Sequence, residues 1–343
     1  MAVATPPTTY VPVPTGAPPS GPRVLESKID RGDRYFRIGT GSTGVAVLAL
    51  MAAVGIFLSV QAAQALSKTG LRFLTTEDWQ PDRQHFGIAA VMSGTVIIAM
   101  IAVAVALPVA MGSALFITEV APARLRSTLV ALVDLMAAIP SVVYGLWGAY
   151  YFQDKVLSVS RFMATWFAWI PIFKVDGSTP HQPLSNASVF SASAFIAGLV
   201  VALMVIPIQC SVMREVFSQV PLGEREGALA LGSTRWGMIR SVSIPFGQAG
   251  IIGGTMLGLG RALGETIAVV LIISPLFSIN FHVLQTGTNS VSSLIALRYG
   301  EASGFGLSAL FAAGLALFLM TLGVNYVASI FIARSRSGAS SEA

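Results

Sequence analysis

The stretch from Arg225 to Glu265 contains the sequences REGALALG (225–232), VSIP (242–245) and GRALGE (260–265). Its first part is polar and helix-forming, whereas its last part places Arg261 and Glu265 in an otherwise apolar, glycine-rich segment. A charge at the centre of a bilayer costs roughly 2.5–3.5 kcal/mol on insertion scales, so it is not expected there without a partner or water. The stretch therefore indicates a loop that engages a soluble partner and leads directly into a charged site within the membrane.

The composition is that of an integral membrane protein. Of the 343 residues, 54% are hydrophobic and only 11% are charged, whereas soluble domains carry about 25% charged residues. About 20 consecutive apolar residues span a bilayer, and the uncharged runs predict an all-α fold with six transmembrane helices. These helices are expected at about 44–66, 86–118, 128–152, 190–213, 246–274 and 307–333.

The rest of the chain is divided by composition. Residues 1–22 are rich in Pro, Thr and Gly and predict a disordered tail. The expected sections are a basic N-terminal tail at 1–40, a first helix and external loop at 41–85, a core at 86–333 with a loop at about 222–245, and a tail at 334–343.

Residues 156–173 are apolar and aromatic but short for a transmembrane helix. Tryptophan is enriched at membrane interfaces, and this segment contains Trp166 and Trp169. An interfacial or re-entrant piece is therefore favoured over a seventh helix.

The distribution of basic residues predicts the orientation. With six helices, the two tails and the loops on their side hold 13 of the 21 Lys and Arg residues, and the opposite loops hold 7. Cytoplasmic loops carry the excess of Lys and Arg, so both termini and the 222–245 loop are expected in the cytoplasm. A seventh helix at 156–173 would move that loop to the other side.

Several functional classes are disfavoured. His85, His181 and His282 are scattered without metal-ligand spacing, and Cys210 is the single cysteine, so neither a metal site nor an internal disulfide is expected. The basic residues form no patch with aromatic residues that would indicate nucleic acid binding. The predicted helices contain no histidine and no nucleophile–base constellation, which disfavours an intramembrane enzyme.

The loop has a pattern that carries more information than its composition. Glu226, Ala228 and Gly232 are followed by Val242-x-Ile244-Pro245, which resembles the EAA loop of ABC importer permeases, with Gly227 where the family usually has Ala. The resemblance implies that Glu226, Ala228, Gly232 and Pro245 belong to a coupling helix and its return, which dock on a separate ATPase. The alternative is an ordinary amphipathic connector that lies on the lipid headgroups.

Two roles are open for the intramembrane charges. Arg261 and Glu265 are four residues apart and are expected on one helical face. They either neutralise each other and hold the helices in register, or Arg261 offers its planar fork to an oxyanion while Glu265 orients it. Asp134 is the other acid within a predicted helix. Gly254/Gly258 and Gly260/Gly264 are pairs of small residues typical of close helix packing.

Two motifs, AIPSVVYGLWG (138–148) and GLGRALGET (258–266), look like those of the PstC family of phosphate importer permeases. The likeness covers roughly residues 30–335. It implies a type I ABC importer (MetI-like) permease fold, with Arg261 and Glu265 in the phosphate path. Asp134 is included in that path, although the family usually has Glu there.

The resemblance also implies partners. They are a second permease subunit (PstA-like), a cytoplasmic ATPase dimer (PstB-like) and an external phosphate-binding protein (PstS-like). The chain has no Gly-x4-Gly-Lys-Ser/Thr phosphate loop, so ATP is expected to be bound by the ATPase partner and no cofactor by this chain. Permeases for sulfate, molybdate or phosphonate are the nearest alternatives. A secondary transporter or channel would need no EAA-like loop.

Overall fold

The computed structural model describes residues 31–83, 85–175 and 187–336, so the predicted disordered tail at 1–22 lies outside the described residues. The chain divides into two units, 1–52 and 53–343. The described part of the first unit is the start of helix α1 (Arg31–Thr69), whose side chains are exposed. The helix begins at Arg31, within the N-terminal tail predicted at 1–40. Asp33 in its first turn suits the positive end of the helix dipole.

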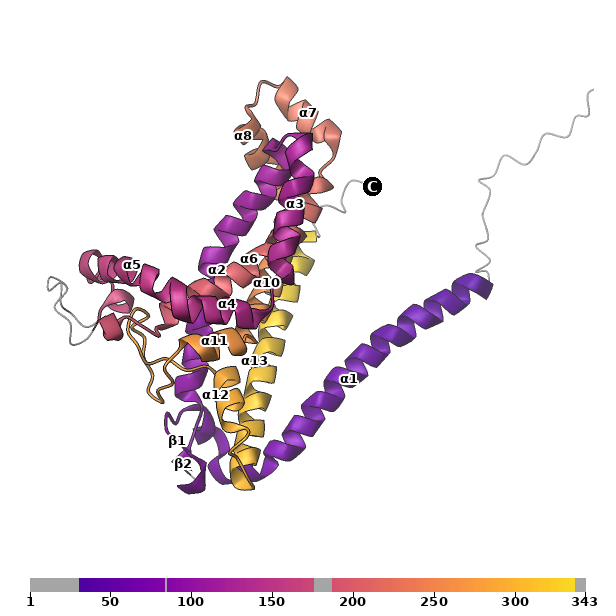
Figure 1. Ribbon diagram of the computed structural model, residues 1–343. Coiled ribbons are helices and arrows are strands. Elements are labelled where there is room, and N and C mark those ends of the chain that lie inside the picture. The colour runs from indigo at the N-terminus through magenta and orange to yellow at the C-terminus, as the bar shows by residue number, and fades with distance from the viewer. Residues whose placement is uncertain (1–30, 84, 176–186, 337–343) are drawn as a thin grey trace, which may run out of the picture. The chain divides into compact units, whose positions relative to one another are not determined.

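Four helices form the core of the second unit: α2 (Ala89–Leu115), α6 (Ala194–Ser218), α10 (Gln248–Leu263) and α13 (Phe305–Arg336). Helix α2 packs along α6, and α10 packs against α6, α2 and α13 (Figure 1). The contact surface of α2 consists of small residues such as Ala99, Ala102 and Ala106, which are completely buried. Small side chains let membrane helices approach closely, and this is how the core is assembled.

Four of the described helices are long and apolar enough to cross a membrane, and there are six candidates if each of two bent pairs counts as one. The four are α1, α2, α6 and α13, where α2 continues into the π-helix η3 (Phe116–Val120). The six predicted positions are therefore occupied by helical segments. The third and fifth are not straight.

The third predicted helix, at 128–152, is broken. Helix α3 (Ala123–Ala138) ends before Pro140, and the chain then turns by 87° into a second arm. That arm consists of α4 (Ser141–Trp147), η4 (Gly148–Phe152) and α5 (Gln153–Trp166). The residue before a proline is pushed out of the helical conformation, and Ile139 has an extended backbone with ψ of 127°.

The fifth predicted helix, at 246–274, is also interrupted. Helix α10 ends at Leu263, and α11 (Ile267–Ile272) begins after a short break. Pro245 does not end the preceding helical segment, because it lies in the first turn of α9 (Ile244–Phe246), where proline is tolerated. The chain bends instead at Gly247, by 68°. A Cβ atom on Gly247 would lie 2.3 Å from the ring of Phe217.

Within the described part of the chain, residues 156–173 do not form a separate seventh transmembrane helix. Helix α5 has 14 residues and continues the arm that starts at Ser141. It is followed by the short turn η5 (Pro171–Phe173). Trp166 and Trp169 are 68% and 78% exposed. Their position at a membrane interface remains a prediction.

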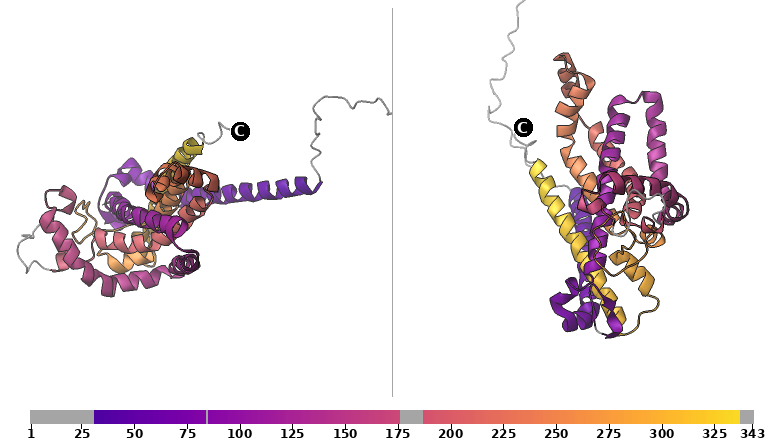
Figure 2. Two further views of the ribbon diagram at one scale, coloured as in Figure 1. Left: turned by 90° about the horizontal axis from the view of Figure 1, so that it is seen from above. Right: turned by 90° about the vertical axis from the view of Figure 1, so that its left-hand side faces the viewer.

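Two groups of short elements lie at opposite ends of the core (Figures 1 and 2). At the coupling-loop end are α7 (Leu222–Ala230), α8 (Arg235–Met238) and η7 (Ile239–Ser243). At the hairpin end, β1 (Trp79–Gln80) pairs antiparallel with β2 (His85–Phe86). The other elements there are η1 (Gly70–Leu74), η2 (Pro81–Arg83) and α12 (Val291–Arg298). The remaining short turn is η6 (Ala187–Val189).

The glycines of α10 determine how closely it approaches α6. A Cβ atom on Gly258 would lie 2.6 Å from Val205, and one on Gly250 would lie 2.5 Å from Val216. Gly254 also faces α6, so the predicted Gly254/Gly258 packing is confirmed. The Gly260/Gly264 pair is different. The nearest atoms to a Cβ there are 3.8 and 3.6 Å away, and no neighbouring helix within the described chain needs these two glycines.

We expect the substitution Gly250→Ala to destabilise the protein by roughly 1–3 kcal/mol, because the added methyl group overpacks a tight helix contact. The matched control is Gly227→Ala in α7, where a Cβ atom meets nothing within 4 Å. Alanine is favoured over glycine in a helix by about 0.8–1.0 kcal/mol, so this variant should be slightly more stable. Thermal unfolding of both variants in detergent measures the difference. Equal unfolding temperatures would show that the α6–α10 contact is loose.

Candidate functional site

The first arm of the coupling loop ends at Gly232. The amide of Gly232 donates to the carbonyl of Leu229 at 3.0 Å, and the amide of Ser233 donates to the carbonyl of Ala228 at 3.2 Å. This pair of bonds is the Schellman arrangement, which needs a left-handed residue after the helix. Gly232 has φ of +84°, a conformation that only glycine adopts without strain. Gly232 therefore ends helix α7.

Helix α7 presents an uncovered surface. It contains no buried residue, and Glu226 is exposed. Leu222 at the start of α7 and Leu231 just after its end are 68% and 91% exposed. Exposed leucines grouped around an acid are typical of a surface that is covered by another protein. Ala228 is half-buried and faces the core, and Pro245 is exposed.

The return arm of the loop is attached to the core. Thr234 caps α8 by accepting a bond from the amide of Gly237 at 3.1 Å. Met238 and Ile239 are each 5% exposed and pack in a cluster with residues at the ends of α2 and α6. Glu119, in η3 directly after α2, contacts Arg225 and Ser243 of the loop and was not selected from the sequence. An acid that ends a long apolar run is the signal that could have identified it.

The charges of Arg261 and Glu265 meet across the break between α10 and α11. Nη2 of Arg261 lies 3.7 Å from Oε2 of Glu265. The predicted pair is confirmed, but it does not lie along one continuous helix, because α10 ends at Leu263. The side chain of Glu265 is 5% exposed and that of Arg261 is 47% exposed. The distance exceeds the 2.7–2.9 Å of a strong charge-assisted hydrogen bond.

Glu265 is held in place on several sides. Its Oε1 accepts a bond from the amide of Ala268 at 3.3 Å, at the start of α11. An acid is favourable at a helix N-terminus. The carbonyl of Glu265 accepts a bond from the hydroxyl of Ser292 at 2.7 Å. The acid is therefore fixed, while most donors of the half-exposed Arg261 guanidinium remain available. A cation in this position can bind an oxyanion.

A run of small polar residues, 288–293, packs behind Glu265. This run was not selected from the sequence, where its signal is the polar string TNS followed, after Val291, by SS. Ser290 caps α12 by accepting a bond from the amide of Ser293 at 3.2 Å. Thr95 of α2 accepts a bond from the amide of Val291 at 2.9 Å. These bonds attach the segment to α2 and thereby support the position of Glu265.

The structure does not bring Asp134 to this pair. Its side chain is exposed on α3, a helix that packs against α6. Among the described residues it forms no ion pair with Arg261, whose acidic partner is Glu265. Helix α3 ends at Ala138, just before the bend at Pro140. A bond of 3.0 Å from the hydroxyl of Tyr144 to the carbonyl of Met136 holds the two arms of the bend together.

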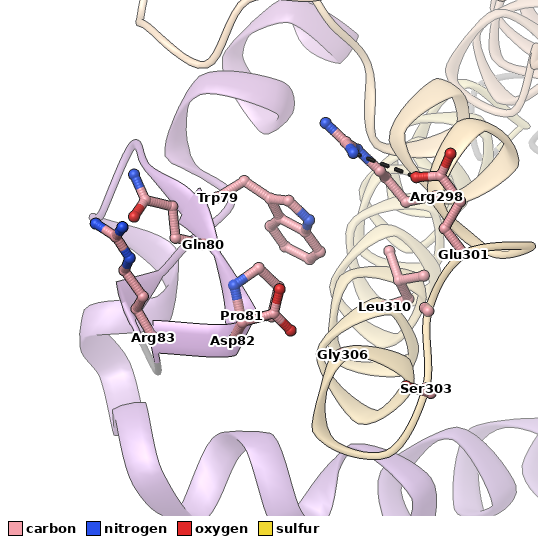
Figure 3. Close-up of a pocket in the computed structure, with 11 residues that line it drawn as sticks. Trp79, Gln80, Pro81, Asp82, Arg83, Arg298, Glu301, Ser303, Gly306 and Leu310 are labelled. Carbon is pink, nitrogen blue, oxygen red and sulfur yellow. Dashed lines mark hydrogen bonds and ion pairs between the residues drawn. The ribbon is translucent and has the colours of Figure 1, made fainter.

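A pocket of about 450 Å³ lies at the hairpin end (Figure 3). Arg298 forms an ion pair with Glu301 at 3.4 Å on one wall of this pocket. Trp79 and Leu310 contribute apolar surface, and Arg83 adds a second cation. None of these residues was selected from the sequence. No three His, Cys, Asp or Glu side chains lie close enough to hold a metal ion anywhere in the described ranges.

Curated relatives are similar to the chain over most of its length. The phosphate transport system permease protein PstC of Pasteurella multocida is 37% identical over 300 residues, which cover 87% of this chain and 91% of the relative. PstC 2 of Mycobacterium tuberculosis is 36% identical over 303 residues, with coverage of 87% and 91%. PstC of Xylella fastidiosa is 34% identical over 327 residues, with coverage of 95% and 97%. No protein-family model matches the chain.

The fold is similar to that of solved ABC transporters. A bacterial ABC transporter involved in the import of the acidic polysaccharide alginate matches with a TM-score of 0.54 and 17% identity, over 88% of this chain and 96% of that chain. The same kind of transporter in complex with an alginate pentasaccharide-bound periplasmic protein matches with a TM-score of 0.52 and 16% identity, over 86% and 93%. The predicted type I ABC importer permease fold is confirmed. From the sequence relatives above, the chain belongs to the PstC family of phosphate transport system permease proteins.

Proposed function

We propose that this chain is the permease subunit of an ATP-driven importer of inorganic phosphate and forms half of its translocation path. The observation that carries the proposal is the geometry of Arg261, a half-exposed cation at a helix break beside a buried, fixed acid. The guanidinium fork matches the oxygens of a phosphate. Glu265 keeps the arginine in position and reduces its net attraction for the anion, which allows release.

Energy comes from a separate ATPase in this proposal. Helix α7 docks on the ATPase dimer through Glu226 and the exposed leucines around it. The chain itself is non-catalytic, and ATP is bound by the partner. The coupling-loop end and both termini then face the cytoplasm, as the excess of basic residues on that side favours.

The hairpin end faces outward in this orientation. An external phosphate-binding protein delivers the ion there, and a second permease subunit completes the path. One solved structure of similar fold contains a periplasmic binding protein together with its transporter, which supports an importer of this general design. The relatives named for phosphate transport support phosphate as the ion.

The test is uptake of labelled phosphate at limiting concentration, in cells with and without this chain. We expect deletion to abolish uptake, and excess sulfate or molybdate not to compete in cells that have the chain. Competition by sulfate or molybdate would assign the path to another oxyanion. Uptake that depends on the chain but persists after removal of the ATPase partner would indicate a secondary transporter or channel. Uptake that is unchanged by deletion would contradict the phosphate assignment in that cell.

A further inference from the structure

A single carboxylate oxygen connects the end of α2 to both arms of the coupling loop. The side chain of Glu119 is 3% exposed, and its Oε1 lies 3.2 Å from Nη2 of Arg225 in α7. The same oxygen accepts a hydrogen bond of 3.1 Å from the hydroxyl of Ser243, at the end of η7. Ser243 is completely buried. One atom thus contacts the outgoing helix of the loop and its returning helix.

Arg225 extends this connection to α6. Its Nη2 also donates to the carbonyl of Phe217 at 2.5 Å, in the last turn of α6. Carbonyls at a helix C-terminus lack intrahelical partners and carry partial negative charge, so a cation is favourable there. The Arg225 guanidinium therefore connects α7 with the ends of α2 and α6, the two helices that pack along each other in the core.

Glu119 is in a position that is unfavourable without this partner. It lies in the last turn of the helical segment formed by α2 and η3, where the helix dipole opposes a negative charge. A buried charge that has lost its partner is strongly destabilising, whereas apolar residues of similar volume can replace a whole buried pair at little cost. Stability alone therefore does not require a carboxylate here, and a functional requirement is the better explanation.

The backbone around Glu119 and Ser243 has the features of a segment that changes conformation. Glu119 lies in the π-helix η3 and Ser243 in the π-helix η7. Such segments are rare and are frequent at functional sites. In addition, Nε of Arg225 is buried and makes no hydrogen bond among the described residues. The guanidinium has a spare donor for a second arrangement of the loop.

We infer that Glu119 is a positioning residue for energy coupling, which passes movements of α7 to α2 and, through Arg225, to α6. The inference rests on the proposed function, because it requires that α7 docks on an ATPase. Glu119 does not touch the ATPase in this role. It acts behind the docking surface, whose exposed residues Glu226 and Leu231 are separate from it.

The experiment uses the complete complex of both permeases, the ATPase dimer and the phosphate-binding protein in proteoliposomes, and measures phosphate transported per ATP hydrolysed. The variant Glu119→Gln keeps the shape and the acceptor for Ser243 but removes the charge. We expect normal assembly, continued ATP hydrolysis, and a ratio lowered about tenfold, within the ~5- to 150-fold range of ordinary coupling between two sites. The double variant Glu119→Arg/Arg225→Glu restores opposite charges and should recover part of the ratio.

The matched control is Glu215→Gln, near the C-terminal end of α6. The carboxylate of Glu215 is exposed and, among the described residues, its only hydrogen-bond partner is Gln219. Its ratio should equal that of the unmodified complex. An unchanged ratio in Glu119→Gln overturns the inference.

If Glu119→Gln does not assemble, Ser243→Ala and Arg225→Lys provide the same test, because both variants keep the Glu119 carboxylate. An unchanged ratio in both variants overturns the inference. Failure of the unmodified complex to transport phosphate would instead contradict the proposed function.

Discussion

Replacing Arg261 with glutamine is expected to abolish phosphate uptake while the importer still assembles. Glutamine retains the approximate length but removes the charge and the planar fork that match an oxyanion. Loss of hydrogen bonds between charged groups costs up to about 3 kcal/mol, which corresponds to roughly a 100-fold decrease in uptake at limiting phosphate. Uptake of labelled phosphate and co-purification of the partner subunits measure the two effects separately.

A second variant distinguishes transport from simple neutralisation. In Arg261→Gln, the buried Glu265 loses its ion-pair partner, and an unpaired buried charge is itself destabilising. The double variant Arg261→Gln/Glu265→Gln removes that problem. If Arg261 only neutralises Glu265, the double variant transports phosphate; if Arg261 binds the ion, it remains inactive. Arg72→Gln, an exposed arginine at the hairpin end, is the control and should transport normally. Normal uptake by Arg261→Gln would show that the phosphate path does not depend on Arg261.

Changing both Glu226 and Gly232 is expected to release or uncouple the ATPase. Glu226→Lys reverses an exposed charge on α7, so any loss must come from a partner and not from the folding of this chain. Gly232→Ala forces a Cβ atom into the left-handed conformation, at a cost of roughly 1–2 kcal/mol, and disturbs the end of α7. Interface hot spots contribute about 2 kcal/mol or more. We therefore expect the ATPase to bind at least ~30-fold more weakly.

Co-purification of the ATPase with the detergent-solubilised permeases, at several ATPase concentrations, measures this loss. The matched control is Glu224→Lys, the same charge reversal two positions earlier on α7. Residues two apart do not share a helical face, so the control should retain the ATPase. Full ATP-driven uptake by the Glu226→Lys/Gly232→Ala variant would exclude α7 as the docking helix.

The features that the sequence predicted correctly are local ones. Helices α2, α6 and α13 follow from uncharged apolar runs, because a bilayer requires a continuous hydrogen-bonded backbone with apolar side chains. The end of α7 follows from a single glycine, since its left-handed backbone disfavours other residues. The approach of Arg261 to Glu265 follows from a spacing of four residues, which survives even though the helix ends between them.

The bends were only partly predictable. Pro140 signals a break, but the 87° turn after it depends on what the second arm packs against. Tyr144 and Gly145 of that arm are buried, and a Cβ atom on Gly145 would lie 2.8 Å from the backbone of Ala268 in α11. The chain turns to make this contact. Hydropathy does not detect such a turn, because the sequence from Leu135 to Phe152, on both sides of it, is uncharged.

The sequence alone identified a membrane permease, and it predicted a coupling loop and a pair of opposite charges four residues apart, because these features depend on composition and on spacings within one segment. The tertiary structure decided which distant residues meet. It joined Glu119 to Ser243, 124 residues further along the chain, placed the polar run 288–293 against Glu265, and left Asp134 exposed on α3. Such contacts depend on how whole helices pack. A local pattern such as Gly254/Gly258 indicates close packing but does not identify the partner helix.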